Sequence, residues 1–428
     1  MKKVKFSRRT FLKSGLTGIV VLFLWAILEI YRRMIRPIPS PLKSGNNIPT
    51  TSSLTPQPIY LPDDFLNNVS NPGAQISSYL SGSSQKIIVF PLNKTWTLEQ
   101  QVKLIGMKNT TVDFNGCTLR MPDSCGFTPA YDRYALAVLN SSSCTLKGIN
   151  LDGNRLGNVG NDEYGIVIGE SANLAIQNST FHDFTHHAIV IYKNTPLLEF
   201  DNTTVYDNFG MNTCADIYIE NGTTDSVSFS NTKAYRKFGS GNQVFYVNGF
   251  NSSIDDVSAK DVRVVADYRR GKHSLKNVVT DHCQMVIIIQ GASAELIASG
   301  IIGTNLETAH GLDSGLYIYA CTSANLENIH LESLLSVKKP FGLRFNAGAH
   351  KVMGNNISIK NAYTACLEYD EVGESIYLSN IILARDFPQT LGYSIRVSHC
   401  TAHQYIKSLT ATPTDMRISD PDKFLVVS

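Results

Sequence analysis

Between Tyr164 and Phe238, one pattern of apolar and polar residues occurs three times. The segments that begin at Asn178, Asn202 and Asn231 read NSTFHDF, NTTVYDNF and NTKAYRKF, and a short polar turn and an alternating apolar strand follow each. The repeat is roughly 23 to 28 residues long. Units of this length with period-two strands bury their apolar faces by stacking on their neighbours. The pattern therefore predicts a parallel β-helix.

Strands with the same alternation recur between residues 134 and 398. Each is expected to add one rung to a shared sheet, which gives a solenoid of about ten coils. Because alternate side chains of a strand point to opposite faces, the residues between the inward apolar pairs are expected to point outward. The predicted outward column is Val167, Val190, Tyr218, Tyr246, Ile288, Tyr317, Arg344, Glu368 and Arg396.

The chain before the first rungs is expected to form a lid and a tether. Apolar residues between Phe65 and Leu80 predict a short helix over the open end of the solenoid, although Pro72 interrupts them. A lid is needed because uncovered strand edges promote aggregation. Residues 37–62 are rich in Pro, Ser, Thr and Asn without a period, which predicts a flexible linker. The β-helix domain is therefore expected at 63–428.

Residues 1–36 combine basic residues with an apolar run at 15–30. The stretch SRRTFLK, which contains Arg8 and Arg9, resembles the twin-arginine export signal of bacteria. The resemblance implies transport by the twin-arginine translocase to the periplasm or another extracytoplasmic location. No small-x-small cleavage motif follows, so two outcomes stay open: removal of the segment, or its retention as a short inner-membrane anchor.

Composition and charge exclude other classes of protein. The chain has 428 residues, of which 43% are hydrophobic and 17% charged, so it can bury a large core. Residues 1–36 hold nine basic residues and one acidic residue, which leaves 29 basic and 35 acidic residues in the remainder. That remainder is acidic overall, so a general nucleic-acid-binding surface is not expected.

Two segments near the start of the solenoid resemble a known superfamily. Residues 86–98 read KIIVFPLNKTWTL, and residues 110–121 read TTVDFNGCTLRM. They are similar to the first coil of pectin-lyase-like β-helix proteins, which implies an all-β, right-handed, single-stranded parallel β-helix with a capping helix. This superfamily includes polysaccharide lyases, glycoside hydrolases, epimerases and phage tailspikes, so the fold does not fix the function.

Aromatic and cationic residues on the expected outward face are candidates for substrate binding. Rungs about 4.8 Å apart would present a ladder of rings and hydroxyls to an extended sugar polymer. The alternative is aromatic stacking that stabilises the sheet without a ligand. The predicted binding residues are Tyr192, Tyr218, Tyr246, Tyr317, Tyr319 and Arg344.

Ionisable residues at the turn before these strands are candidates for catalysis. Aligning NSTFHD, NTTVYD, NTKAYR, SAKDVR and NVVTDH places five of them in one column, and Asp216 follows just beyond the turn. Neighbouring charges shift pKa values and suit proton transfer. The alternative is a structural ladder in which Asp207 and Arg236 pair. The predicted catalytic residues are Asp183, Asp207, Arg236, Arg263, His282 and Asp216.

These residues fit more than one reaction. In a lyase or epimerase, Arg236 or Arg263 would neutralise a uronate carboxylate while His282, a tyrosine or an arginine removes the C5 proton. In a hydrolase, two carboxylates such as Asp183 and Asp207 would act together. The sequence lacks the paired-Asp and Gly-His-Gly motifs of polygalacturonases, so hydrolysis is less favoured than elimination or epimerisation.

No metal or other cofactor is predicted. The stretch FHDFTHH at 181–187 places three histidines close together, but histidines spaced by four chelate well only on a helix, and a solvated turn is the preferred interpretation. No aspartate cluster like that of calcium-dependent pectate lyases is present, so calcium has no support. The basic stretch DYRRGKH at 267–273 is expected to form a loop beside the sugar face.

The residues together predict an exported β-helix that binds an acidic extracellular polysaccharide. Action as a polysaccharide lyase, epimerase or glycoside hydrolase is the favoured hypothesis. An export signal before a β-helix of this size also resembles the β-helix proteins of colanic-acid biosynthesis in enteric bacteria. That resemblance implies the alternative of a non-catalytic scaffold or guide in exopolysaccharide production.

Overall fold

The computed structural model describes most of the chain after residue 55. The described residues are 56–125, 134–158, 163–192, 195–208, 215–220, 226–236, 241–249, 251–306, 314–334, 341–386, 393–412, 415–419 and 421–427. The predicted signal or anchor and most of the predicted linker lie outside these residues. Within the described ranges, no helix combines the length and apolarity that a membrane span requires.

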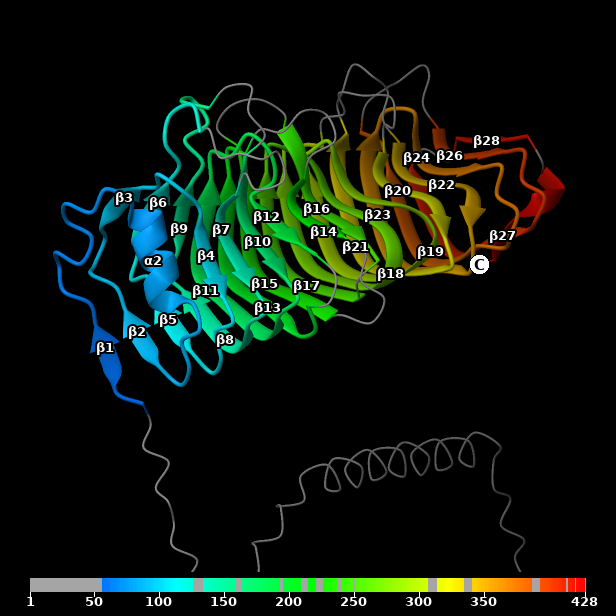
Figure 1. Cartoon of the computed structure of the whole chain (residues 1–428). Helices are drawn as coiled ribbons and strands as arrows, with labels where there is room; N and C mark the ends of the chain where they lie inside the picture. Colours follow the sequence, from blue (N-terminus) through cyan, green and yellow to red (C-terminus); the bar gives the residue numbers. More distant parts are fainter. Residues whose placement is uncertain are drawn as a thin grey trace, which may run out of the picture. The chain divides into compact units, whose positions relative to one another are not determined.

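The described chain forms a parallel β-solenoid of about eleven turns (Figure 1). Strands pair in parallel with the strand one coil further along, as β14 does with β16 and β15 with β17. Each coil therefore adds one strand to each of three stacked faces, here called face 1, face 2 and face 3. The predicted all-β parallel β-helix is confirmed.

Face 1 contains the strands that the sequence predicts as rungs. They are β4 (Val102–Ile105), β7 (Tyr134–Leu139), β10 (Tyr164–Gly169), β12 (Ile189–Ile191), β14 (Ala215–Glu220), β16 (Gly241–Asn248), the first parts of β18 (Val262–Asp281) and β19 (Met285–Thr304), β20 (Ser314–Cys321), β22 (Phe341–Ala349), β24 (Ala365–Asp370), β26 (Tyr393–Ser398) and β28 (Met416–Ile418).

Faces 2 and 3 are built by the remaining strands, and many of these bend from one face to the other. Face 2 begins with β1 (Pro58–Tyr60), β2 (Ile87–Val89), β5 (Thr111–Asp113) and β8 (Ser142–Lys147), and face 3 begins with β3 (Thr95–Thr97), β6 (Thr118–Arg120) and β9 (Asn150–Asp152). Later strands are β11 (Ala172–His182), β13 (Leu198–Tyr206), β15 (Ser226–Tyr235), β17 (Asn251–Lys260), the later parts of β18 and β19, β21 (Ser323–Leu334), β23 (Val352–Ala362), β25 (Tyr377–Ala384) and β27 (Gln404–Thr412), with η1 (Pro421–Lys423) and β29 (Phe424–Val427) last.

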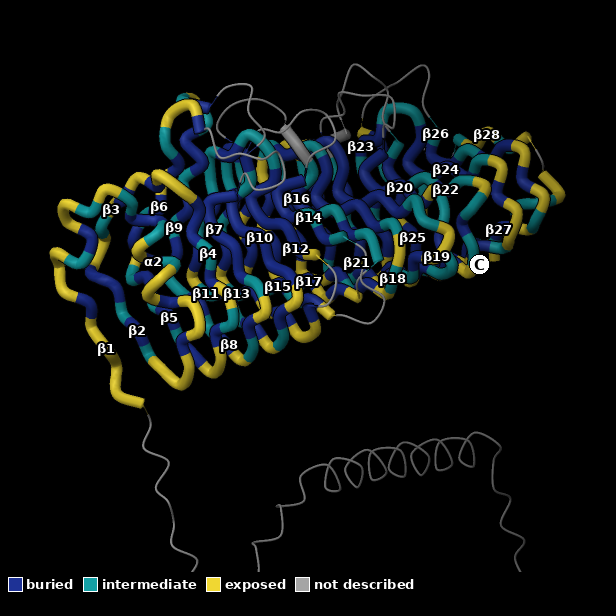
Figure 2. The backbone as a smooth tube through the Cα atoms, viewed as in Figure 1, coloured by how far each residue is buried: buried dark blue, intermediate teal, exposed yellow. Residues whose placement is uncertain are grey.

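Columns of apolar side chains form the core. Ile189, Ile217 and Phe245 lie in register on consecutive rungs of face 1 and are fully buried. Burying a side chain of this size contributes about 1.5 to 3 kcal/mol, so a column that repeats over many coils stabilises the solenoid strongly. Figure 2 shows the consequence, since buried residues run along the stacked strands while exposed ones gather at the turns.

The asparagines that begin each sequence repeat form the corner between faces 2 and 3. Asn178, Asn202 and Asn231 have φ values of 51°, 51° and 55°. Asparagine tolerates this left-handed conformation better than most residues, so it allows the sharp bend. The Asn202 side-chain amide also donates a hydrogen bond to Asn178 Oδ1 at 2.8 Å. The repeat in the sequence is therefore a repeat of this corner.

The solenoid starts earlier than the sequence predicts. β1 pairs with β2 through Pro58 and Ile87, so ordered structure precedes the expected boundary at Asp63. The predicted capping helix is present as α2 (Pro72–Leu80), with the Asn71 side chain accepting a hydrogen bond from Ala74 N. Pro72 begins the helix because a first-turn residue needs no N–H partner.

Helix α2 covers the open edge of β4. Ser77 Oγ accepts a hydrogen bond from Lys103 N at 2.8 Å, and Ser81 Oγ accepts one from Ile105 N at 3.2 Å. Serines one helical turn apart thus replace the partners that another strand would supply.

Replacing Ser77 with alanine is expected to lower the free energy of unfolding by about 1 to 3 kcal/mol, because Lys103 N loses its partner. Chemical denaturation followed by circular dichroism measures this. Ser78→Ala, at an exposed position of the same helix, is the control and should change stability by less than about 0.5 kcal/mol. Equal effects of the two substitutions would show that the serine contact does not stabilise the cap.

Candidate functional site

Face 1 carries one column of residues that point away from the main core. Strand register places Tyr218 opposite Tyr246, and the column continues in both directions without a break. All predicted members lie in this column, which also contains Asp267 between Tyr246 and Ile288. Its described members are Lys103, Ala137, Val167, Val190, Tyr218, Tyr246, Asp267, Ile288, Tyr317, Arg344, Glu368, Arg396 and Arg417.

Parts of this column are buried, which corrects the expectation of an open sheet face. Val167 and Val190 belong to a small apolar cluster outside the main core, and Ile288 and Tyr317 belong to another. Tyr317 is only 4% exposed and its hydroxyl lies 3.1 Å from Asn346 Nδ2. The predicted tyrosine ladder is therefore interrupted, and the accessible residues form separate groups.

The first accessible group is aromatic. The rings of Tyr218 and Tyr246 stack with centroids 5.1 Å apart and an angle of 2° between their planes. His187 stacks on Tyr218 at 4.6 Å, and the Arg269 guanidinium lies 5.4 Å from the centre of the Tyr246 ring. Burial raises the pKa of Tyr218 to about 12, so its hydroxyl remains a hydrogen-bond donor at neutral pH. Because the ring faces are stacked on one another, this group offers ring edges and hydroxyl donors to a ligand.

Two other predicted binding residues reach the surface. Tyr192 is 44% exposed and Tyr319 is 48% exposed. Tyr192 follows the rung of Val190, and Tyr319 follows the rung of Tyr317, so both lie at the same edge of face 1. They are accessible to a ligand that runs along this edge.

Asp267 is a member of the column that sequence reasoning missed. It accepts hydrogen bonds from Gln243 at 3.1 Å and Gln290 at 3.0 Å, and it pairs with Arg269 Nε at 3.0 Å. Desolvation raises the pKa of this buried carboxyl. The pair holds the partly exposed Arg269 guanidinium beside Tyr246. The strand pattern VVADY at 264–268 indicates this rung, but the basic residues that follow it led to the prediction of a loop.

The predicted basic loop at 267–273 is a strand. β18 passes through it, with a register shift between Tyr268 and Arg270. Tyr268 is buried in the core and stacks on His273 at 4.4 Å. The prediction failed because Tyr268 and His273 both point inward, on either side of the register shift, so the charged residues between them lie on a continuous strand.

The second accessible group is ionic. Glu368 lies between two arginines on the neighbouring rungs, at 2.9 Å from Arg344 Nε and 3.2 Å from Arg396 Nη1. Arg344 also pairs with Asp370 at 2.9 Å, and its guanidinium lies 5.4 Å from the Tyr317 ring centre. Desolvation raises the pKa of Glu368 to about 7, although both arginines oppose the shift.

The predicted turn column is correct at four of its five positions. Backbone hydrogen bonds link Asp183 N to Tyr206 O, Asp207 N to Tyr235 O, and Arg236 N to Lys260 O. The next member is Asp261, which bonds to Asp281 O, so the placement of Arg263 in this column is wrong. The alignment that starts at SAKDVR was two residues out because Asp256, with a φ of 53°, takes the corner position that asparagine takes in the neighbouring coils. His282 completes the column.

The turn column does not bring its ionisable groups to one point. Asp183 and His282 lie four rungs apart, which corresponds to about 19 Å. Asp183 pairs with His182 at 2.8 Å, and His282 pairs with Asp281 at 2.8 Å. Asp183 and Asp207 are on adjacent rungs as predicted, but Asp207 is buried. The column fits a structural ladder better than a shared catalytic centre.

Arg236 and Asp216 form a buried ion pair. Arg236 Nη2 lies 2.8 Å from each carboxylate oxygen of Asp216, and the two side chains are 1% and 0% exposed. The predicted pairing of Arg236 with Asp207 is therefore replaced by pairing with Asp216. A polymer on the surface cannot contact either side chain, so this geometry does not fit their predicted catalytic roles.

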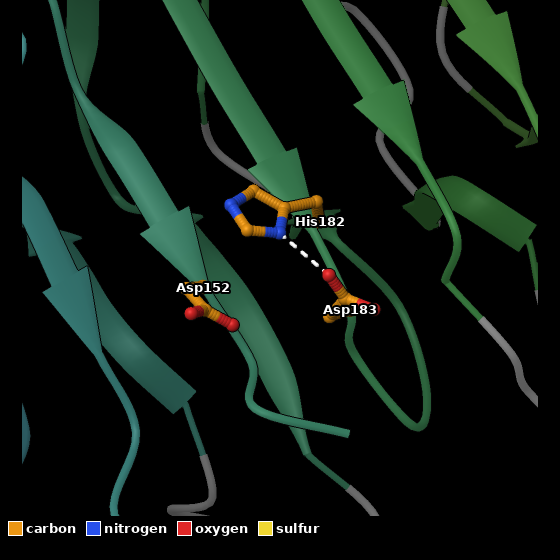
Figure 3. Close-up of side chains that lie close together, drawn as sticks. All are labelled: Asp152, His182 and Asp183. Atoms are coloured by element: carbon orange, nitrogen blue, oxygen red, sulfur yellow. Dashed lines mark hydrogen bonds and ion pairs between the residues drawn. The ribbon is translucent and has the colours of Figure 1, made fainter. Parts of the chain in front are cut away.

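The described residues contain one cluster with the ligand types of a metal site. Atoms of Asp152, His182 and Asp183 all lie within 4.8 Å of one another (Figure 3). Arg120 lies 3.6 Å from Asp152, and Arg155 lies 3.8 Å from Asp183, so arginines already balance both carboxylates. The cluster is therefore explained as an ion-pair network.

The other histidines of FHDFTHH lie elsewhere. His187 is buried against Tyr218, where desolvation lowers its pKa to about 3, and His186 contacts Tyr164. The three histidines of this stretch do not form a single metal site.

Comparison with known proteins identifies the fold. No protein-family model matches the chain, and no curated protein matches it in sequence. The catalytic domain of a GH87 α-1,3-glucanase, solved with tetrasaccharides, matches with a TM-score of 0.50 and 13% identity over 92% of this chain and 69% of that chain. The A-module of a mannuronan C-5 epimerase from Azotobacter vinelandii matches with a TM-score of 0.48 and 12% identity over 84% and 96%. At 13% identity, the likeness to the glucanase domain shows the fold alone, a parallel β-helix.

Proposed function

We propose that this β-helix binds an acidic polysaccharide lengthwise along face 1. The observation that carries the proposal is the arrangement of charge. The carboxyls of Asp267 and Glu368 are buried, whereas the arginines that they hold are 20% to 35% exposed. Fixed guanidinium groups favour binding of carboxylates because little side-chain entropy is lost when the ligand binds.

Aromatic rings complete this binding surface. Tyr218 and Tyr246, which stack on each other, offer their ring edges and hydroxyls to sugar rings, next to Arg269. From Tyr218 to Arg396 the column spans seven rung steps, or about 34 Å, which suits a polymer rather than a single sugar. The export signal suggested by SRRTFLK would place this surface outside the cytoplasm, where such polymers occur.

Double substitution of Tyr218 and Tyr246 with alanine is expected to weaken binding of a uronic-acid polymer at least tenfold, or ~1.4 kcal/mol. The measurement is calorimetry of the full chain in detergent with alginate, pectate and glucuronan. Binding should also weaken with added salt, since charge contributes to it.

The matched control replaces Tyr206 and Tyr235, which stack in the same way on face 3 with centroids 5.0 Å apart. This control should leave binding unchanged. Equal losses in the two double variants would contradict the proposal. So would a wild type that binds none of the acidic polymers, or whose binding does not weaken with added salt.

Action on the bound polymer is the second candidate function. Glu368 is only 1% exposed and does not touch the polymer. The Arg344 and Arg396 guanidinium groups that it holds reach the surface and can neutralise a uronate carboxylate, and the Tyr218 hydroxyl belongs to the same column. A lyase or epimerase would use such groups, whereas a glycoside hydrolase would need two accessible carboxyls. Unsaturated uronides would indicate elimination, and new reducing ends without them would indicate hydrolysis. Tight binding without either product, and without epimerised residues, supports the non-catalytic scaffold instead.

A further inference from the structure

Glu368 is shielded from solvent while its two cationic partners are not. Its Oε2 atom lies 2.9 Å from Arg344 Nε, and its Oε1 atom lies 3.2 Å from Arg396 Nη1. The Glu368 side chain is 1% exposed, whereas those of Arg344 and Arg396 are 20% and 35% exposed. The strands that carry them, β22, β24 and β26, are consecutive rungs of face 1 (Figure 1). One buried carboxylate therefore serves two guanidinium groups that reach the surface.

The charged groups around Glu368 are few. From β22 it faces Arg344, from β26 it faces Arg396, and on its own strand the nearest acid is Asp370. Asp370 pairs with Arg344 Nη2 at 2.9 Å and lies near the Ser398 hydroxyl at 3.3 Å. Among the described residues, this local set has two positive and two negative groups when Glu368 is ionised. A ligand carboxylate would add a third negative group to two arginines.

We infer that Glu368 is a positioning residue that couples the binding of a carboxylated polymer on face 1 to the uptake of one proton. A ligand carboxylate competes with Glu368 for the guanidinium N–H groups of Arg344 and Arg396. Ionised Glu368 would then stay buried with weakened counter-charges, which is costly. Taking a proton from solvent removes that cost and leaves both arginines to the ligand. The inference rests on the proposed function for its ligand class.

Two observations support this coupling. Desolvation raises the pKa of Glu368 to about 7 even with both arginines in contact, so the protonated form is accessible near neutral pH before any ligand arrives. A negative ligand raises this pKa further, because it opposes ionisation of the carboxyl. Affinity for an acidic polymer should therefore rise as pH falls, by up to tenfold per pH unit above pH 7.

The test is calorimetry of the full chain with oligogalacturonate at pH 8 in two buffers that differ in ionisation enthalpy. The carboxylates of this ligand stay ionised throughout, so proton uptake reports on the protein. We expect uptake of close to one proton per bound chain, and affinity that falls by about 25-fold or more between pH 7 and pH 9.

Glu368→Gln is expected to abolish the proton uptake and to make affinity nearly independent of pH, at or above the wild-type affinity at pH 8. Glu295→Gln is the control, because Glu295 pairs with Lys272 on face 2, away from the arginines of face 1, and its substitution should leave proton uptake in place. Melting temperatures of both variants verify that they fold.

The outcomes separate the two proposals. Wild-type binding without proton uptake overturns the coupling and leaves the proposed function intact. Failure of the wild type to bind any acidic polymer overturns both. Uptake that persists in Glu368→Gln assigns the proton to another group and overturns the role of Glu368.

Discussion

Arg236→Ala is expected to destabilise the solenoid by about 3 to 5 kcal/mol without removing any group from the polymer-binding face. Arg236 contacts both carboxylate oxygens of Asp216 at 2.8 Å in the interior. The substitution leaves Asp216 buried without its counter-charge. Desolvation already raises the pKa of Asp216, so this carboxyl has to take up a proton for the fold to persist. Chemical denaturation at pH 7 measures the loss.

The control for this prediction is a pair of the same charge type on the surface. Lys260 and Asp281 lie 3.3 Å apart and are both exposed, so Lys260→Ala should cost less than about 1 kcal/mol. Replacing Arg236 with Met and Asp216 with Asn together should recover much of the stability, because no buried charge remains. If Arg236→Ala keeps its stability but loses polymer binding, the residue contacts ligand, as the sequence suggested.

His273→Gln is expected to make the solenoid less sensitive to acid. Burial lowers the pKa of His273 to about 4, whereas in the unfolded chain it is about 6.5. The unfolded state therefore binds the proton more tightly between these values. The stabilisation that neutral His273 contributes is fully present above about pH 6.5 and is lost as the pH falls towards 4.

Between pH 7 and pH 5 the contribution of His273 amounts to roughly 2 kcal/mol. Over this pH range the wild type should lose about this much more free energy of unfolding than His273→Gln. Both proteins contain carboxyls such as Glu368, so the comparison between them cancels the opposing contribution of these groups. Urea denaturation at both pH values gives the difference. His399→Gln, at an exposed position, should show the wild-type pH dependence. A constant difference between wild type and His273→Gln would mean that His273 does not titrate in this range.

The environment of His273 explains why its pKa is low. Nε2 contacts Arg270 O at 2.7 Å and Nδ1 contacts the Ser252 hydroxyl at 2.9 Å, which fits a neutral ring that donates to the carbonyl and accepts from the serine. Protonation would place a second N–H against Ser252 inside the core. The ring is thus a core residue whose two nitrogens are both satisfied in the neutral state.

The sequence determined the solenoid and the order of residues along face 1. Asparagines such as Asn178 and Asn202 mark the same corner in successive coils, and period-two strands follow them. Because the coils stack in register, residues at equivalent positions of adjacent repeats become neighbours in the structure. For this reason Tyr218 above Tyr246 and Arg344 beside Glu368 could be predicted without a structure.

Only the tertiary structure decided which residues are accessible and which partners they choose. The corner residue of the fourth coil is Asp256 instead of an asparagine, so only the backbone hydrogen bonds place Asp261 rather than Arg263 in the turn column. Only the strand register places Asp267 on face 1. Partners 20 residues apart, such as Asp216 and Arg236, meet because they lie in adjacent coils. Burial likewise depends on neighbouring coils, which cover Tyr317 and Glu368 but leave Tyr319 open. The period of the sequence determines which way a side chain points and on which rung it lies. Its burial and its ionic or hydrogen-bond partners follow from the packing of the coils around it.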